Sequence, residues 1–247
     1  MAEFEINGQA AAEVTEAASG TELAEAARCR SNLYGILSLM YSKEPTAELL
    51  EMLREPAFAQ VLGELGVRLG DDFHTRPDDE LLLELAVEYA RLFLGPGKHL
   101  SPHESVYVGK FSNQEGPGLE GLLCGQATVE VKEAIAGAGF EFLPGYRGIP
   151  DHLGVELEFM QLLAGREAEA WQKGDPQAAL NCLEQEHHFI SNHLARWIPL
   201  FCGKVMESAR LGFYRETARL TRTFIQSEEE NLPALLAGVR GQQKCPA

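Results

Sequence analysis

Asp151, His152 and Glu156 are the residues of this chain whose types and spacing could best do chemistry. They belong to a stretch starting at residue 150, Pro-Asp-His-Leu-Gly-Val-Glu-Leu-Glu-Phe-Met, in which apolar residues recur at helical spacing. On a helix, His152 and Glu156 lie one turn apart within the apolar face. Because an unpaired buried charge is costly, these side chains must bond to each other, bond to another segment, or line a polar groove.

Asp151 stands where the N-cap of this helix is expected, and Pro150 marks the break from the preceding loop. An aspartate at that position can accept hydrogen bonds from backbone N–H groups two or three residues further on. The plainer interpretation is therefore that Asp151 is a cap, and that His152 and Glu156 form a satisfied pair in the core. The sequence leaves the plain and the functional interpretation open.

A metal site is the alternative chemistry for these residues. Residues 184–187 read Glu-Gln-Glu-His, an E-x-x-H pattern. Di-iron helical bundles use two such motifs and two further glutamates, whereas only one occurs here. A helical metal-binding or small-molecule-binding protein is therefore the second hypothesis, and its ligands would be His152, Glu156, Glu184 and His187. If these residues do not bind a metal or a small molecule, no cofactor is expected.

Two further chemistries find little support in the sequence. A phosphate-binding loop around Gly97 would require glycine at position 92 and serine or threonine at position 99, where the chain has Leu92 and His99. No serine, cysteine or threonine has a general base at recognisable spacing. We therefore expect no catalytic residues and no enzymatic activity.

Helical periodicity dominates the chain, and alternating β-branched runs are nearly absent. This pattern predicts an all-α protein with a single helical-bundle-like domain of about eight to ten helices. The expected helices span approximately 21–45, 47–53, 57–65, 78–94, 119–138, 152–173, 175–197, 199–209 and 213–230. We expect a disordered segment at 1–19, the helical domain at 20–233 and a loose tail at 234–247.

A segment rich in glycine and proline at about 95–118 has too many helix breakers to form a single helix. Compact domains seldom keep so long a loop without a function. It could be a binding loop or a hinge through which two protomers exchange helices. The plainer interpretation is a linker that is partly helical around Glu104–Tyr107.

The charge balance limits the class of partner. The chain has 21 Lys and Arg residues against 37 Asp and Glu residues, a net charge of −16, and no basic cluster. Nucleic acid and anionic membranes require an electropositive face, so neither is an expected partner. A basic peptide is favoured instead, although the charge could simply keep a soluble helical protein from associating.

The cysteines and the N-terminus indicate a cytoplasmic protein. The five cysteines are widely scattered and have no metal-ligand spacing, which is typical of reduced thiols. The N-terminus lacks the basic and apolar regions of a secretory signal. No stretch approaches the ~20 apolar residues that span a bilayer, so no stable membrane insertion is expected.

Three motifs occur in a characteristic order along the chain. An E-Y-x-x-L-F-x-G-P run begins at Glu88, a P-H-E-S segment begins at Pro102, and a D-H-x-x-x-E-L-x-F-M helix begins at Asp151. With these motifs the chain resembles the TorD/DmsD/NarJ-type family of redox-enzyme maturation chaperones. The resemblance runs from about Arg30 to about Trp197.

The resemblance implies a cytoplasmic chaperone that binds the twin-arginine signal peptide of an apo molybdenum-cofactor oxidoreductase. Such a chaperone holds the catalytic subunit for cofactor insertion and then permits export. A twin-arginine signal presents an arginine pair followed by an apolar stretch, so its receptor needs carboxylates beside an apolar groove.

The expected peptide-binding residues come from the three motifs. They are Tyr89, Leu92, Phe93, Pro102, His103, Glu104, Ser105, Asp151, His152 and Glu156. Asp151, Glu156 and Glu104 would meet the arginines, and His152 would orient the carboxylates. Tyr89, Leu92 and Phe93 would form the apolar wall with Pro102 and His103, although their spacing also suits a plain core position.

Several finer properties stay open at this point. His103 stands where many family members place an aromatic ring. The NarJ-like branch serves enzymes that are not exported, so the chain could instead hold a remnant N-terminal segment of its client. The client, the binding of a guanine nucleotide, and the choice between a monomer and a helix-swapped homodimer are also undecided.

Overall fold

A computed structural model describes residues 19–64, 66–69, 71–95, 99–108 and 123–244 of the chain. The described residues form helices and no named β-strand, and a single isolated bridge joins His103 to His152. The prediction of an all-α protein is therefore confirmed. No described helix is both long enough and apolar enough to cross a bilayer.

The elements follow one another along the chain in this order. The α-helices are α2 (Gly20–Ser42), α3 (Ala47–Arg54), α4 (Pro56–Glu64), α5 (Asp78–Tyr89), α6 (Glu104–Val108), α7 (Gln126–Gly137), α8 (Leu153–Gln172), α9 (Pro176–Phe189), α10 (Ala195–Ser208) and α11 (Gly212–Lys244). A 3-10 turn, η1, spans Asp71–His74, and two π-helical turns, η2 and η3, span Ala90–Leu94 and Ile190–Leu194.

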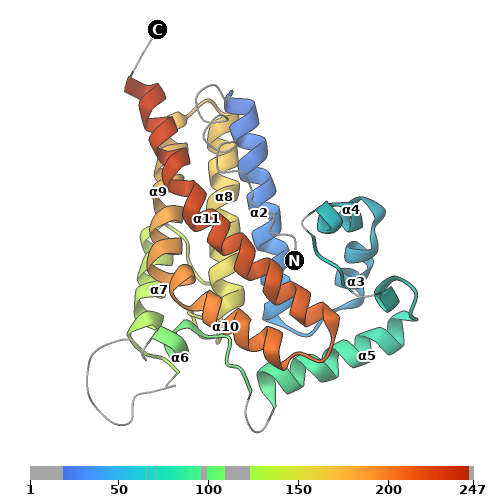
Figure 1. Cartoon of the computed structure of the whole chain (residues 1–247). Helices are drawn as coiled ribbons and strands as arrows, with labels where there is room; N and C mark the ends of the chain where they lie inside the picture. Colours follow the sequence, from blue (N-terminus) through green and yellow to red (C-terminus); the bar gives the residue numbers. More distant parts are fainter. Residues whose placement is uncertain (1–18, 65, 70, 96–98, 109–122, 245–247) are drawn as a thin grey trace.

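Helices α2, α8, α9 and α11 form the main bundle (Figure 1). Helices α3, α4 and α5 make a smaller group beside it, and α6 and α7 lie at the lower end of α8 and α9 as drawn. Helix α8 is central, with Leu153, Leu157, Met160 and Leu163 fully buried. The apolar arc predicted for this helix therefore faces the core.

The opposite side of α8 is covered by α2, which approaches very closely. Ser38 Oγ on α2 donates to the Gly154 carbonyl at 2.7 Å, and a Cβ on Gly154 would overlap Ser42 Oγ. A Cβ on Gly35 would lie 2.7 Å from the side chain of Gln161. These two glycines allow the backbones to pack, so α8 is buried on two faces and not only on the apolar one.

Local capping explains why several helix starts could be predicted. Ser19 and Glu22 form a capping box at the start of α2. Thr46 caps α3, and Asp175 caps α9 with Pro176 in the first turn. These residue types favour such positions because their side-chain oxygens satisfy free N–H groups of the first turn.

Two predicted boundaries were wrong at the C-terminal side of the chain. We expected a break before Pro199, but the helical path runs from α9 through η3 and α10 with Pro199 inside α10. We also expected a loose tail at 234–247, whereas α11 continues to Lys244. Burial of Leu236 and Val239 against the bundle accounts for the extra length, because tertiary packing outweighs local propensity.

Other sequence expectations fall partly or wholly outside the described residues. Residues 1–18 of the expected disordered segment at 1–19 lie outside the described part, and so do residues 96–98 and 109–122 of the expected loop. Within that loop, Glu104–Val108 forms α6, so the predicted helical part is confirmed. The helix expected at 119–138 begins at Gln126, and residues 119–122 lie outside the described part.

A buried cluster of charges joins the four helices of the main bundle. Arg30 on α2 forms ion pairs with Glu167 on α8, with Glu186 on α9 at 2.8 Å, and with Glu228 on α11 at 3.2 Å. The Tyr34 hydroxyl donates to Glu228 at 3.0 Å. Glu186, which stands between Glu184 and His187 of the E-x-x-H pattern, is therefore part of an internal ion-pair network.

Candidate functional site

Asp151 connects three helices through its carboxylate. Its Oδ2 accepts from the backbone N–H of Ser105 on α6 at 2.8 Å, and its Oδ1 accepts from Thr128 Oγ1 on α7 at 2.9 Å. The Asp151 carbonyl also accepts from Glu104 N at 3.0 Å. The side chain is fully buried, so Asp151 caps α6 and ties down the start of α7.

The expectation that Asp151 caps its own helix was wrong. The N-cap of α8 is His152, whose Nδ1 accepts from Gly154 N at 3.0 Å. The reason is that residues 102–104 pair with residues 151–153 through backbone hydrogen bonds, such as Leu153 N to Pro102 O at 2.8 Å. Pairing keeps Asp151 outside α8 and directs its carboxylate toward α6 and α7.

His152 and His103 form a neutral pair of rings. Their centroids are 4.9 Å apart and the rings are nearly perpendicular. Burial, together with the neighbouring His103, lowers the pKa of His152 to about 4, and burial also lowers the pKa of His103. A neutral His152 is consistent with its role as acceptor at the start of α8.

Glu104 and Glu156 are buried acids on either side of the junction between α6 and α8. Glu104 Oε2 lies 2.9 Å from His193 Nδ1, and Glu156 Oε2 accepts from Trp197 Nε1 at 3.1 Å. The second oxygen of each carboxylate has no hydrogen-bond partner among the described residues. Burial raises the pKa of Glu156 well above its usual value, and repulsion from Glu104 and Asp151 adds to the shift, which favours the protonated form of Glu156.

The aromatic residues of the first motif lie in the core and not on an open wall. Leu92 and Phe93 belong to the π-helical turn η2, and both are buried together with Tyr89. The Tyr89 hydroxyl donates to the Tyr41 carbonyl at 2.8 Å. Phe93 contacts Phe201, which in turn contacts Trp197, the partner of Glu156.

The structure thus joins the predicted residues into one continuous internal network. Ser105 contributes its backbone N–H, while its hydroxyl is buried without a partner among the described residues. Pro102 is also buried. The acids Glu104, Asp151 and Glu156 have no exposed surface. In this conformation they do not line an open groove, contrary to the expected geometry.

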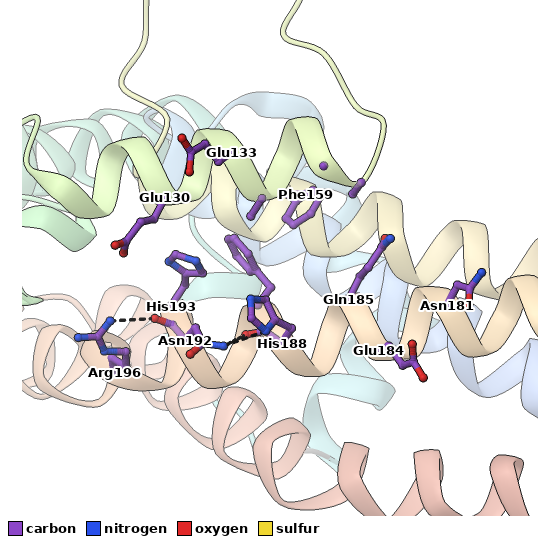
Figure 2. Close-up of a pocket in the computed structure, with 14 residues that line it drawn as sticks. Glu130, Glu133, Phe159, Asn181, Glu184, Gln185, His188, Asn192, His193 and Arg196 are labelled. Carbon is purple, nitrogen blue, oxygen red and sulfur yellow. Dashed lines mark hydrogen bonds between the residues drawn. The ribbon is translucent and has the colours of Figure 1, made fainter.

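An open groove of about 930 Å³ lies next to this network, between α7 and the continuous stretch formed by α9 and η3 (Figure 2). Its apolar floor includes Phe159 of α8 and Phe189 of α9. Glu130 and Glu133 of α7 and Glu184 of α9 supply carboxylates along its edges. Polar side chains of η3 and of the first turn of α10 complete the lining.

The acids of the groove are accessible, unlike those of the internal network. Glu130 is half-buried and points toward His193 and Arg196 across the groove (Figure 2). Its Oε1 accepts from Gln126 Nε2 at 3.1 Å. Glu133 is exposed, and Glu184 forms an exposed ion pair with Arg240 at 2.6 Å. Carboxylates in this setting can receive guanidinium groups in bidentate geometry.

The π-helical turn η3 shapes the far wall of the groove. Asn192 Nδ2 donates to the His188 carbonyl at 2.8 Å, and Arg196 donates to the Asn192 carbonyl at 3.2 Å. His193 faces the other way, toward Glu104. One residue of this turn therefore connects the open groove to the buried acids, and π-helical turns of this kind are frequent at functional sites.

This groove was not identified from the sequence. Glu130 and Glu133 lie about 60 residues before His188 and Asn192, and each reads as an ordinary surface residue of a helix. The nearest hint was Glu184 of the alternative metal set. The described residues contain no group of three or more His, Cys, Asp or Glu that could hold a metal ion, so the structure does not assemble His152, Glu156, Glu184 and His187 into a metal site.

Curated relatives of this chain are named as chaperones. It is 28% identical over 219 residues to the chaperone protein TorD of Shewanella pealeana, which covers 84% of this chain and 91% of that protein. The TorD of Vibrio parahaemolyticus is 27% identical over 214 residues, which covers 82% of this chain and 94% of that protein. A crystal structure from Archaeoglobus fulgidus, assigned provisionally to a redox enzyme maturation protein, aligns with 21% identity and a TM-score of 0.49 over 80% of this chain and 93% of that chain.

Both of these TorD relatives are named as chaperones and not as enzymes. A family model, that of the nitrate reductase delta subunit, matches residues 43–203. This match covers more than half of the chain, and the chain belongs to that family. The family resemblance stated from the three motifs is therefore confirmed.

Proposed function

We propose that this chaperone binds the twin-arginine signal peptide, or an equivalent N-terminal segment, of an apo molybdenum-cofactor oxidoreductase in the cytoplasm. It holds the catalytic subunit while the cofactor is inserted and before export. The observation that carries the proposal is the groove between α7 and α9, which places several accessible carboxylates around one concave surface.

The chemistry of the groove suits a basic leader followed by apolar residues. A guanidinium group can make two parallel hydrogen bonds to one carboxylate, which a lysine ammonium cannot do. Glu130, Glu133 and Glu184 offer three such acceptors around one concave surface. The net charge of −16 adds long-range attraction for a basic segment.

The residues named by the family motifs act in this proposal mainly by positioning the groove. Asp151 holds the start of α7 through Thr128, and α7 carries Glu130 and Glu133. Glu104 holds His193, which lies at the inner side of the groove. A substitution at Asp151 would therefore weaken peptide binding without direct contact between its carboxylate and the peptide.

Isothermal titration calorimetry tests the proposal with a synthetic twin-arginine leader and its twin-lysine counterpart. Loss of a hydrogen bond to a charged group costs about 1.5–3 kcal/mol, so Glu130→Gln with Glu133→Gln should weaken the arginine peptide at least about tenfold. Glu229→Gln, which removes one charge from an exposed site on α11, is the single-charge control and should change affinity less than about twofold.

Two results would contradict the proposal. If neither peptide binds the unmodified protein, the protein does not recognise leaders of this class. If both peptides bind equally and the two glutamine substitutions have no effect, the groove is not the site of recognition. In the second case the fully buried acids would have to become accessible through a conformational change.

A further inference from the structure

A second, apolar hollow lies on the other side of α7. It has a volume of about 510 Å³ and is lined by Val129, Lys132, Ala136 and Pro150, together with Thr128 and Glu133. Val129 keeps 49% of its surface exposed and lies beside Ala136 and Pro150 in this hollow, so the three residues form one accessible apolar surface. Neither the family membership nor the groove described above explains what this hollow binds.

Glu133 lines both the groove and the hollow. On the helical wheel of α7, Glu130, Ala134 and Gly137 face the groove, whereas Val129, Lys132 and Ala136 face the hollow. Glu133 lies between these two faces. The exposed side of α7 is therefore a ridge with an acidic depression on one side and an apolar depression on the other.

The chain that follows α7 adds apolar surface near the hollow. It leaves α7 after Gly137 and returns to Pro150, which lines the hollow. This loop carries Leu143 with 81% of its surface exposed and Tyr146 with 43% exposed, whose ring stacks on Phe142. Large apolar side chains that are this exposed commonly mark a surface that contacts a partner.

We infer that the leader crosses α7, with its arginine pair in the acidic groove, Glu133 at the crossing point, and its apolar stretch in the hollow beside Val129 and Ala136. This inference rests on the proposed function and adds a direction of binding to it. The acidic groove and the apolar hollow lie next to each other across α7, just as the arginine pair and the apolar stretch lie next to each other along such a leader.

Lys132 supports the same direction of binding. Its ammonium group lies at the hollow and not at the groove, so it disfavours entry of the arginine pair on that side. Its methylene chain can still contact apolar residues of the peptide. The groove has one cation, Arg196, beside Glu130, Glu133 and Glu184, whereas the hollow has Lys132 beside Glu133. The larger number of acids in the groove therefore disfavours the reversed orientation.

Substitution at Val129 tests the inference without disturbing α7. Asparagine has nearly the same helix propensity as valine, so Val129→Asn should preserve the fold while it removes apolar contact. We expect this variant to bind a full leader about tenfold more weakly and to bind a short peptide that ends after the arginine pair with unchanged affinity. Glu133→Gln should weaken both peptides.

The matched control is Val87→Asn on α5, where valine keeps 62% of its surface exposed far along the chain from α7. It should bind both peptides as the unmodified protein does. Full affinity of Val129→Asn for the full leader, or equal weakening of both peptides, would overturn the inference. Neither result touches the proposed function, which fails if the unmodified protein binds no leader or if the glutamine substitutions in the groove leave binding of both peptides unchanged.

Photo-cross-linking gives the direction independently of affinity. A benzoylphenylalanine in place of Val129 should label the apolar stretch of the leader, and the same group in place of Gln185, which lines the groove, should label residues next to the arginine pair. Exchange of the two labelling patterns would show that the peptide lies in the opposite direction, and the inference would be wrong.

Discussion

Two clusters of buried carboxylates in this molecule are neutralised in different ways. In the main bundle, Glu167, Glu186 and Glu228 surround the guanidinium of Arg30. Beside the groove, Glu104 has His193 as its ion-pair partner, and Glu156 has no ion-pair partner among the described residues. One cluster has the guanidinium of Arg30 at its centre, and the other has the imidazole of His193 and the indole N–H of Trp197.

The difference indicates which cluster can change with its surroundings. Burial alone would lower the pKa of Arg30, but the attraction of three carboxylates outweighs it and raises the pKa well above the usual value. Arg30 therefore stays charged across the physiological pH range, and it pairs with acids from the three other helices of the bundle. Burial instead raises the pKa of Glu156 and favours its protonated form. A change of pH or of nearby charge can shift a carboxyl group and an imidazole between their charged and neutral forms, whereas an arginine stays charged.

Replacement of Arg30 should have the largest effect on stability. Arg30→Met keeps much of the side-chain volume but removes the cation and donor that the buried acids Glu167, Glu186 and Glu228 share, so we expect a loss of about 3–5 kcal/mol in the free energy of unfolding. Urea denaturation followed by circular dichroism measures it. Arg28→Met, which changes an exposed arginine on the same helix, is the control and should be nearly neutral. Equal stability of the two variants would show that Arg30 contributes little.

Asp151→Asn should have the second-largest effect on stability, because Asp151 contacts both α6 and α7. An amide oxygen can replace one carboxylate oxygen as acceptor, but the amide NH2 cannot accept the other hydrogen bond from Ser105 N or Thr128. We expect a loss of roughly 1–3 kcal/mol in urea denaturation and a weaker leader complex in calorimetry. Glu158→Gln, on the exposed side of α8, serves as the control. If Asp151→Asn lowers neither the stability nor the affinity for the leader, the contact with Thr128 does not position α7.

The internal network could be predicted from the sequence in part, and the groove could not. His152 and Glu156 stood out because they interrupt an apolar helical face, and the inference that they need partners is confirmed by Gly154 N and Trp197. That inference could not say whether the partners are internal. A polar residue on an apolar face reads the same whether it is sealed in the core or lines a binding site.

The groove depends on tertiary packing, which leaves no local pattern. Glu130 of α7 and His188 of α9 become neighbours only because both helices pack beside α8. The π-helical turns are also invisible in a pattern of period 3.6, although both occur at sites of interest. The start of α9 at Asp175 could be predicted because its capping chemistry is local, whereas Ser19 was assigned to the expected disordered segment and caps α2.

A smaller effect on stability is expected from a change of pH, and it arises from Glu186 in the Arg30 cluster. Burial raises the pKa of Glu186 to about 8 from an ordinary value of 4.5, despite the opposing attraction of Arg30. The folded state therefore holds this proton more tightly than the unfolded state, so its contribution to stability is full below about pH 4.5 and is lost as the pH rises toward 8. One proton corresponds to a slope of at most about 1.4 kcal/mol per pH unit.

Glu186→Gln should reduce this loss of stability, because the amide does not titrate. Urea denaturation at pH 6 and at pH 8 measures the difference for each protein. Glu184→Gln, two residues earlier on the exposed side of α9, should retain the slope of the unmodified protein. A slope that is the same in all three proteins would mean that Glu186 does not hold a proton in this range.

Glu156→Gln should have the smallest effect, and this sharpens the contrast with Arg30. A protonated carboxyl group and an amide have nearly the same shape and no charge, and the amide oxygen can still accept from Trp197 Nε1. We therefore expect a change of less than about 1 kcal/mol at pH 7 in urea denaturation. Glu156→Ala is the comparison, because it leaves the Trp197 N–H buried without an acceptor and should cost roughly 1–3 kcal/mol or more. If Glu156→Gln is instead as destabilising as Arg30→Met, then Glu156 is ionised in the folded protein and must have a cationic partner. The two clusters would then be neutralised in the same way.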